Sequence, residues 1–501
     1  MSSRIADTLG SVHTGLVVLD GIGLGVSDVV RLADGAARPV PGTDAMKRVS
    51  TSWDAARQIA ATGRVYGRST GVGANRNEPV PTEAAAEHGL RLLRSHAGAI
   101  GEELPARQVR AMLAVRANQL LAGGAGLRPT VVTALCEALE SGAYPVVHEF
   151  GSVGTGDIAA LAQAGLALAG EHPWKGAGPE PQPLDNNDAL AFISSNALTL
   201  GQAALALHEL RGLLEATQVV GALSLLAVDG SHEAYAAPVH AARPHRGSSE
   251  VARRMRELIG ADERPTPPLG RIQDPYGFRC LPQIHGPAHD AADALEAVLA
   301  VEINAAAENP LISPEDMAAY HHGGFYQAQL ALALDHFRLA LTQVARLSTS
   351  RLSTLNEPAY TRLRPFLADH EPASSGVMIL EYAAGAALGD LRAFSAPASL
   401  GHAVLSRGVE EQASFASLAA RQTLRACGAY RLVVGCELVA AVRALRQRDH
   451  APDPALPVGR ALELAFSVLD EDQADRPLTG DVTTAAALLD RFTDIWRGSE
   501  A

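Results

Sequence analysis

Four short segments of the chain hold glycine, tyrosine, arginine and carboxylate residues in patterns that packing alone does not require. In the first, residues 65–73, three glycines follow Tyr66 and make a flexible or tightly turned loop. The tyrosine phenol can act as a general acid or base. Read by itself, this segment is more often a plain surface loop with a packed tyrosine, because glycine-rich loops are common.

The second segment, residues 151–157, is rich in glycine and directly precedes a helix-like run over residues 158–170. Such a loop can present backbone N–H groups to an anion. It can equally be an ordinary helix start with Asp157 as the N-cap, and that interpretation is favoured because caps are far more common than anion sites.

The third segment, residues 273–283, gathers Gln273, Tyr276, Arg279 and further polar groups before another helix. Arginine is the natural bidentate partner of a substrate carboxylate, and a tyrosine can serve as a base. A buried turn whose polar groups satisfy the backbone explains the segment equally well. The fourth segment, residues 302–310, predicts a helix that ends before Pro310, with Glu302 and Ala306 on one face.

Long helices must position these segments. From residue 329 onward an apolar stripe recurs at three- and four-residue steps, and similar patterns cover residues 197–227, 288–307, 376–394 and 409–446. These patterns predict a mainly α protein with a long helix bundle over residues 191–501, including a peripheral helical tail after residue 449. Shorter elements predict a smaller N-terminal domain over residues 1–190, and a Gly/Pro-rich surface loop at residues 176–183 precedes the boundary.

The bulk composition excludes several classes of protein. A formal charge of −13 argues against a nucleic-acid partner. No signal peptide is expected, because the first apolar stretch, residues 15–19, is short and ends at Asp20, and no uninterrupted apolar run reaches the length of a membrane helix. The four cysteines show no CxxC spacing, so neither a disulfide framework nor a zinc site is expected. These features predict a cytoplasmic protein with no metal.

Together, and in this order, the four segments resemble the histidine and phenylalanine ammonia-lyases and the related 2,3-aminomutases. The most specific stretches read Gln-Asp-Pro-Tyr-x-x-Arg-Cys-x-Pro-Gln at residues 273–283 and Glu-x-Asn-Ala-x-x-x-Asn-Pro-Leu at residues 302–311. Residues 93–98, 242–245 and 375–379 also resemble segments of that family. The resemblance extends over residues 66–446 and is closest in pattern to the histidine branch, because Ser95, His96 and Glu410 are all present.

The resemblance implies an ammonia-lyase/fumarase-like fold and a head-to-tail homotetramer whose active sites combine residues of three subunits. The family needs no external cofactor, because an internal Ala-Ser-Gly forms an electrophilic methylidene-imidazolone ring autocatalytically. The ring's methylene attacks an α-amino acid, a tyrosine removes a β-proton, and ammonia leaves. Lyases and aminomutases of the family share these parts.

The resemblance also assigns roles to individual residues. Tyr66 matches the catalytic base on the lid loop, Glu410 the carboxylate near the leaving amine, and Tyr276 and Gln273 line the pocket of the electrophile. The remaining matches concern the substrate: His96 faces the imidazole ring, Arg279 binds the carboxylate, and Phe325 supplies an aromatic wall.

The loop that would form the electrophile departs from the family pattern. It is one residue shorter and offers Gly154, Thr155 and Gly156 as the precursor. Dehydration of threonine would give an ethylidene whose extra methyl hinders attack, and a shorter loop can lack the compressed geometry that drives ring closure. The asparagine that contacts the ring is replaced by Ser194, unless Asn196 substitutes.

Three hypotheses follow. The chain is a lyase or aminomutase for a histidine-like or other α-amino acid, with a ring made from residues 154–156. Alternatively it lacks the ring and uses Tyr66 and Glu410 as an acid–base pair for another elimination, addition or cyclisation. As a third possibility it is a catalytically inactive scaffold that binds an amino acid.

Overall fold

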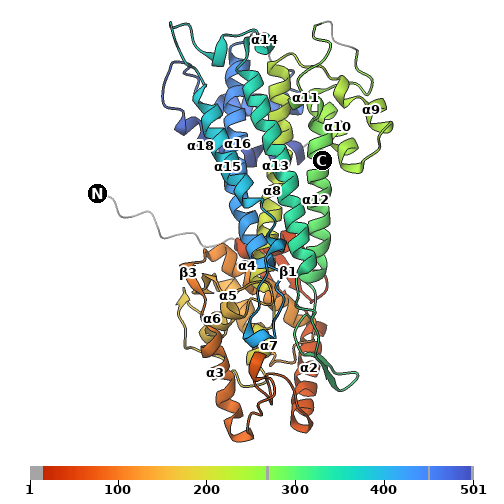
Figure 1. Cartoon of the computed structure of the whole chain (residues 1–501), viewed down its shortest axis with the longest axis vertical. Coiled ribbons are helices and arrows are strands. Elements are labelled where there is room, and N and C mark those ends of the chain that lie inside the picture. The colour runs from red at the N-terminus through yellow and green to blue at the C-terminus, as the bar shows by residue number, and fades with distance from the viewer. Residues whose placement is uncertain (1–14, 267–269, 449–451, 498–501) are drawn as a thin grey trace, which may run out of the picture. The chain divides into compact units, whose positions relative to one another are not determined.

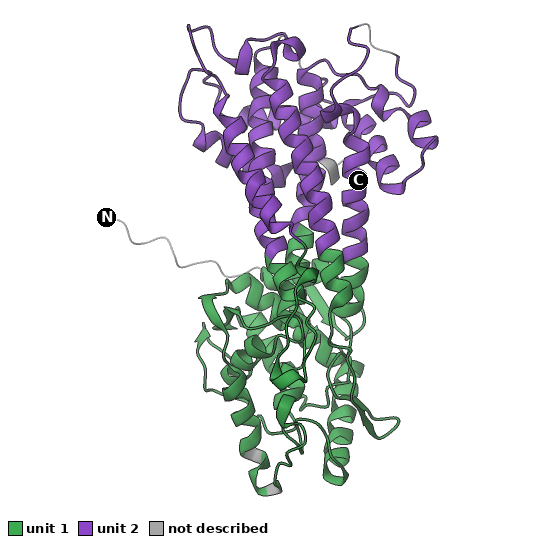
Figure 2. Cartoon of the chain, viewed as in Figure 1, with its two compact units in different colours: residues 1–208, 296–334, 397–421 green, residues 209–295, 335–396, 422–501 purple. Residues whose placement is uncertain are grey.

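The computed structural model describes residues 15–266, 270–448 and 452–497. These residues are mainly α-helical, as the sequence predicts (Figure 1). The prediction that the chain has no signal peptide depends partly on residues 1–14, which lie outside the described residues. The chain divides into two compact units (Figure 2): unit 1 comprises residues 1–208, 296–334 and 397–421, and unit 2 comprises residues 209–295, 335–396 and 422–501. The division at residue 190 stays a prediction.

Unit 1 combines short helices with four two-stranded sheets. Its helices are α1 (Val26–Ala33), α2 (Thr43–Thr62), α3 (Ala85–His96), α4 (Ala106–Leu121), α5 (Thr130–Ser141), α6 (Ile158–Leu168) and α7 (Ala189–Ile193). Its strands are β1 (Leu16–Leu19), β2 (Arg38–Pro41), β3 (Ile100–Glu103), β4 (Tyr144–Pro145), β5 (His148–Phe150), β6 (Trp174–Lys175), β7 (Leu311–Ser313) and β8 (Ala318–Tyr320). β1 pairs with β2 in parallel, whereas the β3–β5, β4–β6 and β7–β8 pairs are antiparallel.

The core of unit 1 forms around α4, which is buried from Val109 to Leu121. Within this helix the Arg116 guanidinium pairs with Glu308 at 2.8 Å, and its Nε donates to the carbonyl oxygen of Phe192 at 2.9 Å. Both members of this ion pair are buried, so each charge depends on the other for compensation. The pair therefore fixes the end of α7 and the segment before Pro310 relative to α4.

The four longest helices are α8 (Ala197–Ala227), α12 (Leu281–Glu302), α13 (Ala328–Leu355) and α16 (Ala416–Arg446). In unit 2 they lie side by side (Figure 1). The shorter helices of this unit are α9 (Ala237–Ala241), α10 (Arg246–Ile259), α11 (Tyr276–Arg279), α14 (Pro358–Thr361), α15 (Ile379–Phe394), α17 (Pro457–Val468) and α18 (Thr479–Arg497).

A buried carboxylate joins three of the long helices within unit 2. Glu437 of α16 receives hydrogen bonds from Ser224 of α8 at 2.7 Å and from Ser348 of α13 at 2.5 Å. Arg351 of α13 donates to both carboxylate oxygens, at 2.6 and 2.8 Å. Since all of these side chains are buried, the network specifies how α8, α13 and α16 align here.

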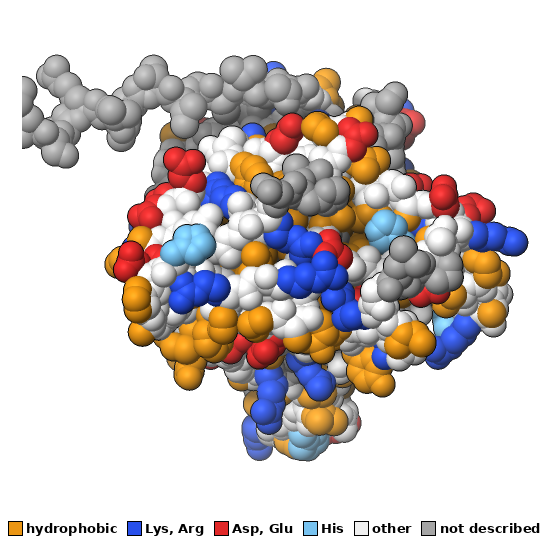
Figure 3. All heavy atoms as spheres, turned by 90° about the horizontal axis from the view of Figure 1, so that it is seen from above, with side chains coloured by type: hydrophobic (Ala, Val, Ile, Leu, Met, Phe, Trp, Pro, Cys, Tyr) orange, Lys and Arg blue, Asp and Glu red, His pale blue; other side chains and the backbone are white. Residues whose placement is uncertain are grey.

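The face of the molecule seen in Figure 3, at the end of unit 2, carries Lys and Arg side chains interspersed with hydrophobic and acidic ones. One helical stretch, residues 189–227, is long and apolar enough to cross a membrane by length and composition. Its most apolar window is 94% buried inside the protein, as expected for a core helix. All four cysteines are free.

Four predicted helix boundaries are wrong. α12 begins at Leu281 instead of residue 288. α12 ends at Glu302, so Ala306 lies outside the helix, because Asn304 is held by hydrogen bonds with Leu24 and Asn118. α15 begins at Ile379 instead of residue 376. α16 begins at Ala416 instead of residue 409, so Glu410 lies in a loop where Ser406 and Arg407 have φ angles of +50° and +57°, outside the helical range.

Candidate active site

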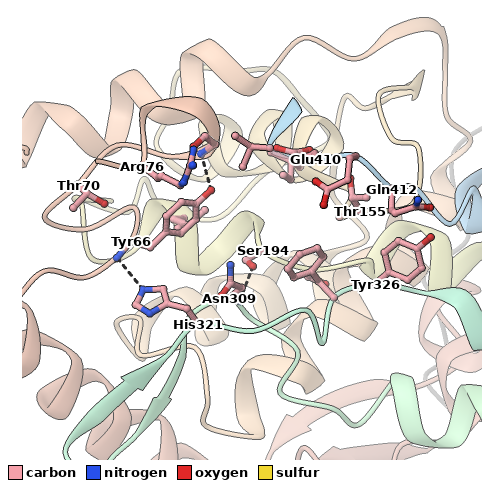
Figure 4. Close-up of a pocket in the computed structure, with 18 of the residues that line it drawn as sticks. Tyr66, Thr70, Arg76, Thr155, Ser194, Asn309, His321, Tyr326, Glu410 and Gln412 are labelled. Carbon is pink, nitrogen blue, oxygen red and sulfur yellow. Dashed lines mark hydrogen bonds between the residues drawn. The ribbon is translucent and has the colours of Figure 1, made fainter. Parts of the chain in front are cut away.

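A cavity of about 700 Å³ lies within unit 1 and collects most of the predicted catalytic groups. Its walls come from five segments: the loop around residues 64–77, the loop at residues 155–156, the end of α7, residues 309–326, and the loop at residues 409–412. Tyr66, Thr155, Tyr326 and Glu410 project into this one cavity (Figure 4). Segments far apart in the sequence therefore meet at one site.

The loop that carries Tyr66 is held by a buried arginine directly after it. The Arg68 guanidinium donates to the carbonyl oxygens of Ala125 and Gly126 at 2.7 and 3.1 Å, and its burial lowers its pKa to about 10. Gly67 has a φ angle of +71°, and a Cβ atom there would lie 2.0 Å from Cδ2 of Leu190. Glycine is required at this position so that the loop can turn against α7 and direct Tyr66 into the cavity.

The Tyr66 phenol receives a hydrogen bond from the backbone N–H of Gly73 at 2.7 Å. Burial raises the pKa of Tyr66, the Gly73 hydrogen bond lowers it, the Glu410 carboxylate raises it and Arg76 lowers it, with a net rise above the usual 10.0. His321 accepts the backbone N–H of Tyr66 at 3.4 Å and packs edge-on against its ring, with centroids 6.4 Å apart. These contacts fix both the backbone and the ring of the tyrosine.

Glu410 is placed by a tight turn that lies against the same loop. Leu405 and Glu410 exchange backbone hydrogen bonds of 2.8 and 3.3 Å. The hydroxyl of Ser406, inside this turn, accepts the N–H of Ala74 at 3.0 Å. The turn therefore brings the carboxylate to the wall that also contains Tyr66.

The loop at residues 151–157 ends at Asp157, whose side chain holds it through hydrogen bonds to Thr199. Asp157 occupies the N-cap position of α6 but makes no side-chain capping bond, so the predicted cap is wrong in this respect. Its buried carboxylate instead accepts the backbone N–H and the hydroxyl of Thr199, at 2.7 and 2.9 Å. Desolvation raises the pKa of Asp157, and these two hydrogen bonds oppose the rise.

Two of the predicted groups on the electrophile side have different partners. Ser194 lines the cavity and accepts the backbone N–H of Asn309 at 3.0 Å. Asn196 does not belong to the lining: its amide donates to the carbonyl oxygen of Phe325 at 2.8 Å, and its Oδ1 has no hydrogen-bond partner among the described residues. Asn196 thus supports the segment that carries Phe325.

Five other predicted residues do not line this cavity, and one of them is Gly154, which directly precedes the lining residue Thr155. His96, at the end of α3, has its Nδ1 within 2.8 Å of the Leu92 carbonyl oxygen. Gln273, Tyr276 and Arg279 belong to unit 2, where the Arg279 guanidinium stacks 4.8 Å from the Tyr276 ring and its Nε donates to the backbone oxygen of Asp274. Among the described residues, no group of three or more His, Cys, Asp or Glu could hold a metal ion.

Comparisons with known proteins bear on the family of this chain. The family model described as aromatic amino acid lyase matches residues 24–470. The chain belongs to the aromatic amino acid lyase family. It is 32% identical over 448 residues to the histidine ammonia-lyase of Caldanaerobacter subterraneus subsp. tengcongensis. The aligned region covers 86% of this chain and 88% of that protein.

Solved structures of similar proteins have the same fold. The ergothioneine-degrading enzyme ergothionase of Treponema denticola matches with a TM-score of 0.89 and 26% identity, covering 96% of this chain and 99% of that one. The tyrosine aminomutase of Streptomyces globisporus matches with a TM-score of 0.89 and 25% identity, covering 96% and 98%. The chain is therefore a carbon–nitrogen lyase of the amino-acid ammonia-lyase or aminomutase type.

The family forms an autocatalytic methylidene-imidazolone, and the loop of this chain does not fit the alanine of the family's precursor. Gly154 and Gly156 have φ angles of +91° and +118°. A Cβ at position 154, where the family has alanine, would lie 2.2 Å from the Ser414 Oγ and 2.8 Å from the Phe415 nitrogen. Backbone atoms that cannot move far close this space, so the loop has no room for an alanine at position 154.

Proposed function

We propose that the cavity catalyses β-elimination of the α-nitrogen from a histidine-like α-amino acid or a derivative of one. The observation that carries the proposal is the position of the Tyr66 phenol in the same cavity as Glu410 and Thr155. In this proposal Tyr66 removes the β-proton, and the Glu410 carboxylate attracts the cationic nitrogen before it leaves.

The base must be the phenolate, since a protonated phenol cannot accept the β-proton. The N–H of Gly73, which donates to the phenol oxygen at 2.7 Å, stabilises the anion once it forms. Because the pKa of Tyr66 is raised, only a small fraction is ionised at neutral pH, and that fraction reacts as a strong base. Phe325 and Ser194 are proposed to contact the substrate, and Asn196 to support them.

We further propose that a second copy of the chain completes the site in a cytoplasmic homotetramer. The segment with Gln273, Tyr276 and Arg279 supplies the carboxylate clamp in this arrangement, and His96 faces the side chain of the substrate. Two exposed apolar side chains of the segment support a buried role in an assembly, since Ile272 is 92% exposed and Tyr276 69% exposed in the single chain.

A second candidate substrate is ergothioneine or a related imidazole compound. The similarity to ergothionase supports it, as does a loop that does not fit the family's electrophile. The ring from residues 154–156 that the family resemblance predicts remains the competing route to the same elimination.

The purified full chain tests the proposal with a panel of histidine, other aromatic amino acids and their N-methylated derivatives. Release of an amine with an α,β-unsaturated acid identifies a lyase, and a β-amino acid identifies an aminomutase. Tyr66→Phe should reduce kcat by about 100-fold or more with little change in KM, as expected for loss of a general base. Full turnover in this variant contradicts the proposal.

A further inference from the structure

We propose that residues 151–157 remain an ordinary peptide in the mature enzyme, and that the cavity takes an α-amino acid whose α-nitrogen is permanently cationic, as in a quaternary ammonium. This inference rests on the proposed function and names its substrate class.

The hydrogen bonds of the loop oppose ring formation. Ring closure joins the amide nitrogen of Gly156 to the carbonyl carbon of Gly154 and expels the Gly154 oxygen as water. That oxygen accepts the hydroxyl of Ser414 at 2.7 Å, and Ser414 is buried. Closure would therefore remove the acceptor of a buried donor, an arrangement that proteins avoid.

A second set of bonds fixes the other side of the loop. The Ser152 hydroxyl donates to the carbonyl oxygen of Gly156 at 3.0 Å and accepts the N–H of Gly154 at 3.1 Å. The N–H of Phe415 donates to the Val153 oxygen at 2.8 Å. These bonds satisfy the loop as a peptide, so its folded conformation does not favour attack by Gly156 on Gly154.

The lining of the cavity suits a cation that has no N–H groups. Tyr66, Phe325 and Tyr326 contribute aromatic rings, and Glu410 and Glu411 contribute carboxylates. Aromatic faces and carboxylates attract a quaternary ammonium without any hydrogen bond from it.

The same cavity also contains positive charge for the carboxylate of such a substrate, in addition to the Arg279 clamp proposed from a second copy of the chain. Arg64 and Arg76 line it from the Tyr66 loop. An amino-acid betaine carries one carboxylate and one fixed cation, so both of its charges find opposite charges in the lining.

The chemistry of such a substrate makes an electrophile unnecessary. The Tyr66 phenolate takes the β-proton, and the electron pair of the Cβ–H bond forms the Cα=Cβ bond. The Cα–N bond breaks with its electron pair on nitrogen, which leaves as a neutral tertiary amine. A quaternary nitrogen is always in its cationic leaving form, whereas a primary amine is converted to a poor leaving group whenever it loses a proton.

Peptide mass spectrometry over residues 151–157 of the active full chain is the first test, combined with assays of histidine and its Nα-trimethyl derivative. The expected result is an unmodified peptide, with kcat/KM for the trimethyl derivative exceeding that for histidine by about 100-fold or more. Loss of two waters with ammonia release from histidine overturns this inference and leaves the proposed function intact. No turnover of either compound contradicts both.

Substitutions at Thr155 give an independent test with a matched pair. Without a ring, Thr155→Ala and Thr155→Ser both lower turnover by less than about tenfold, because each changes one contact in the lining. With a ring, Thr155→Ser retains a dehydratable side chain, whereas Thr155→Ala abolishes turnover. A large difference between the two variants overturns the inference.

The aromatic lining is tested with Tyr326. Tyr326→Phe keeps the ring and should keep the KM for the trimethyl derivative within about twofold, whereas Tyr326→Leu should raise it by about fivefold or more. Equal KM values for the two variants contradict the predicted cation binding.

Discussion

Restoring the family's alanine at position 154 tests how firmly the loop is packed. In this chain a Cβ on residue 154 meets the Ser414 Oγ at 2.2 Å, the Phe415 nitrogen at 2.8 Å and the Ala416 nitrogen at 2.9 Å. The serine hydroxyl can rotate away, but the two backbone nitrogens cannot without moving the start of α16. The φ angle of +91° adds strain that glycine does not experience.

The two effects set the expected magnitude. An unfavourable φ angle costs about 1–3 kcal/mol, and insertion of a methyl into filled space costs about 1–3 kcal/mol. We therefore expect Gly154→Ala to lower the free energy of unfolding by about 2–5 kcal/mol, allowing for partial relaxation. Differential scanning calorimetry of the full chain should show a Tm lower by several degrees, together with loss of activity as the loop shifts.

Gly98→Ala is the matched control, because a Cβ at Gly98 meets nothing within 4 Å and its φ angle is not in the left-handed region. Its Tm should equal that of the unsubstituted chain. The reasoning is refuted if Gly154→Ala and Gly98→Ala have the same Tm, because the loop would then have room for the alanine and the case against a ring would lose its steric basis.

Three further predictions concern the site and the core. Because the pKa of Tyr66 is raised, the phenolate is a minor form from pH 7 to 9 and its fraction increases about tenfold per pH unit. kcat/KM should increase in the same proportion, and a flat profile excludes Tyr66 as the base. Gly67→Ala should lower both Tm and kcat/KM, because the φ angle of +71° and the contact with Leu190 leave no room for a Cβ and direct the Tyr66 loop; unchanged kinetics count against this role. Glu437→Gln should destabilise the protein by about 3–5 kcal/mol, since it leaves the buried Arg351 without its counter-charge; calorimetry showing a change below about 1 kcal/mol would contradict this role.

Helix content and the long helices could be predicted from the sequence, because apolar stripes recur over many turns. The 197–227 pattern corresponds to α8 with both ends correct. Boundaries failed where side chains compete with the helix: Asn304 bonds to Leu24 and Asn118, and Ser406 and Arg407 take left-handed conformations. A periodic pattern of apolar residues gives no information about such long-range hydrogen bonds.

Of the candidate site, the sequence indicated Tyr66, Phe325 and Glu410, and these line one cavity. His321 and Arg76 were missed, although His321 lies four residues before Phe325 and Arg76 three residues after Gly73, so both were close to segments that had been singled out. Ser414, which donates to the Gly154 carbonyl oxygen, carried no sequence signal, since a lone serine inside the predicted helix of residues 409–446 looks like a solvated residue.

The sequence by itself determined the family, the helical fold class and the unusual composition of the loop at residues 154–156, because each of these follows directly from the order and type of the residues. Only the tertiary structure decided how that loop is held and which groups share the cavity with Tyr66. Those features depend on contacts between segments more than 200 residues apart, such as Ser414 with Gly154 and Ser406 with Ala74. Chain folding creates these contacts, and no local pattern specifies them.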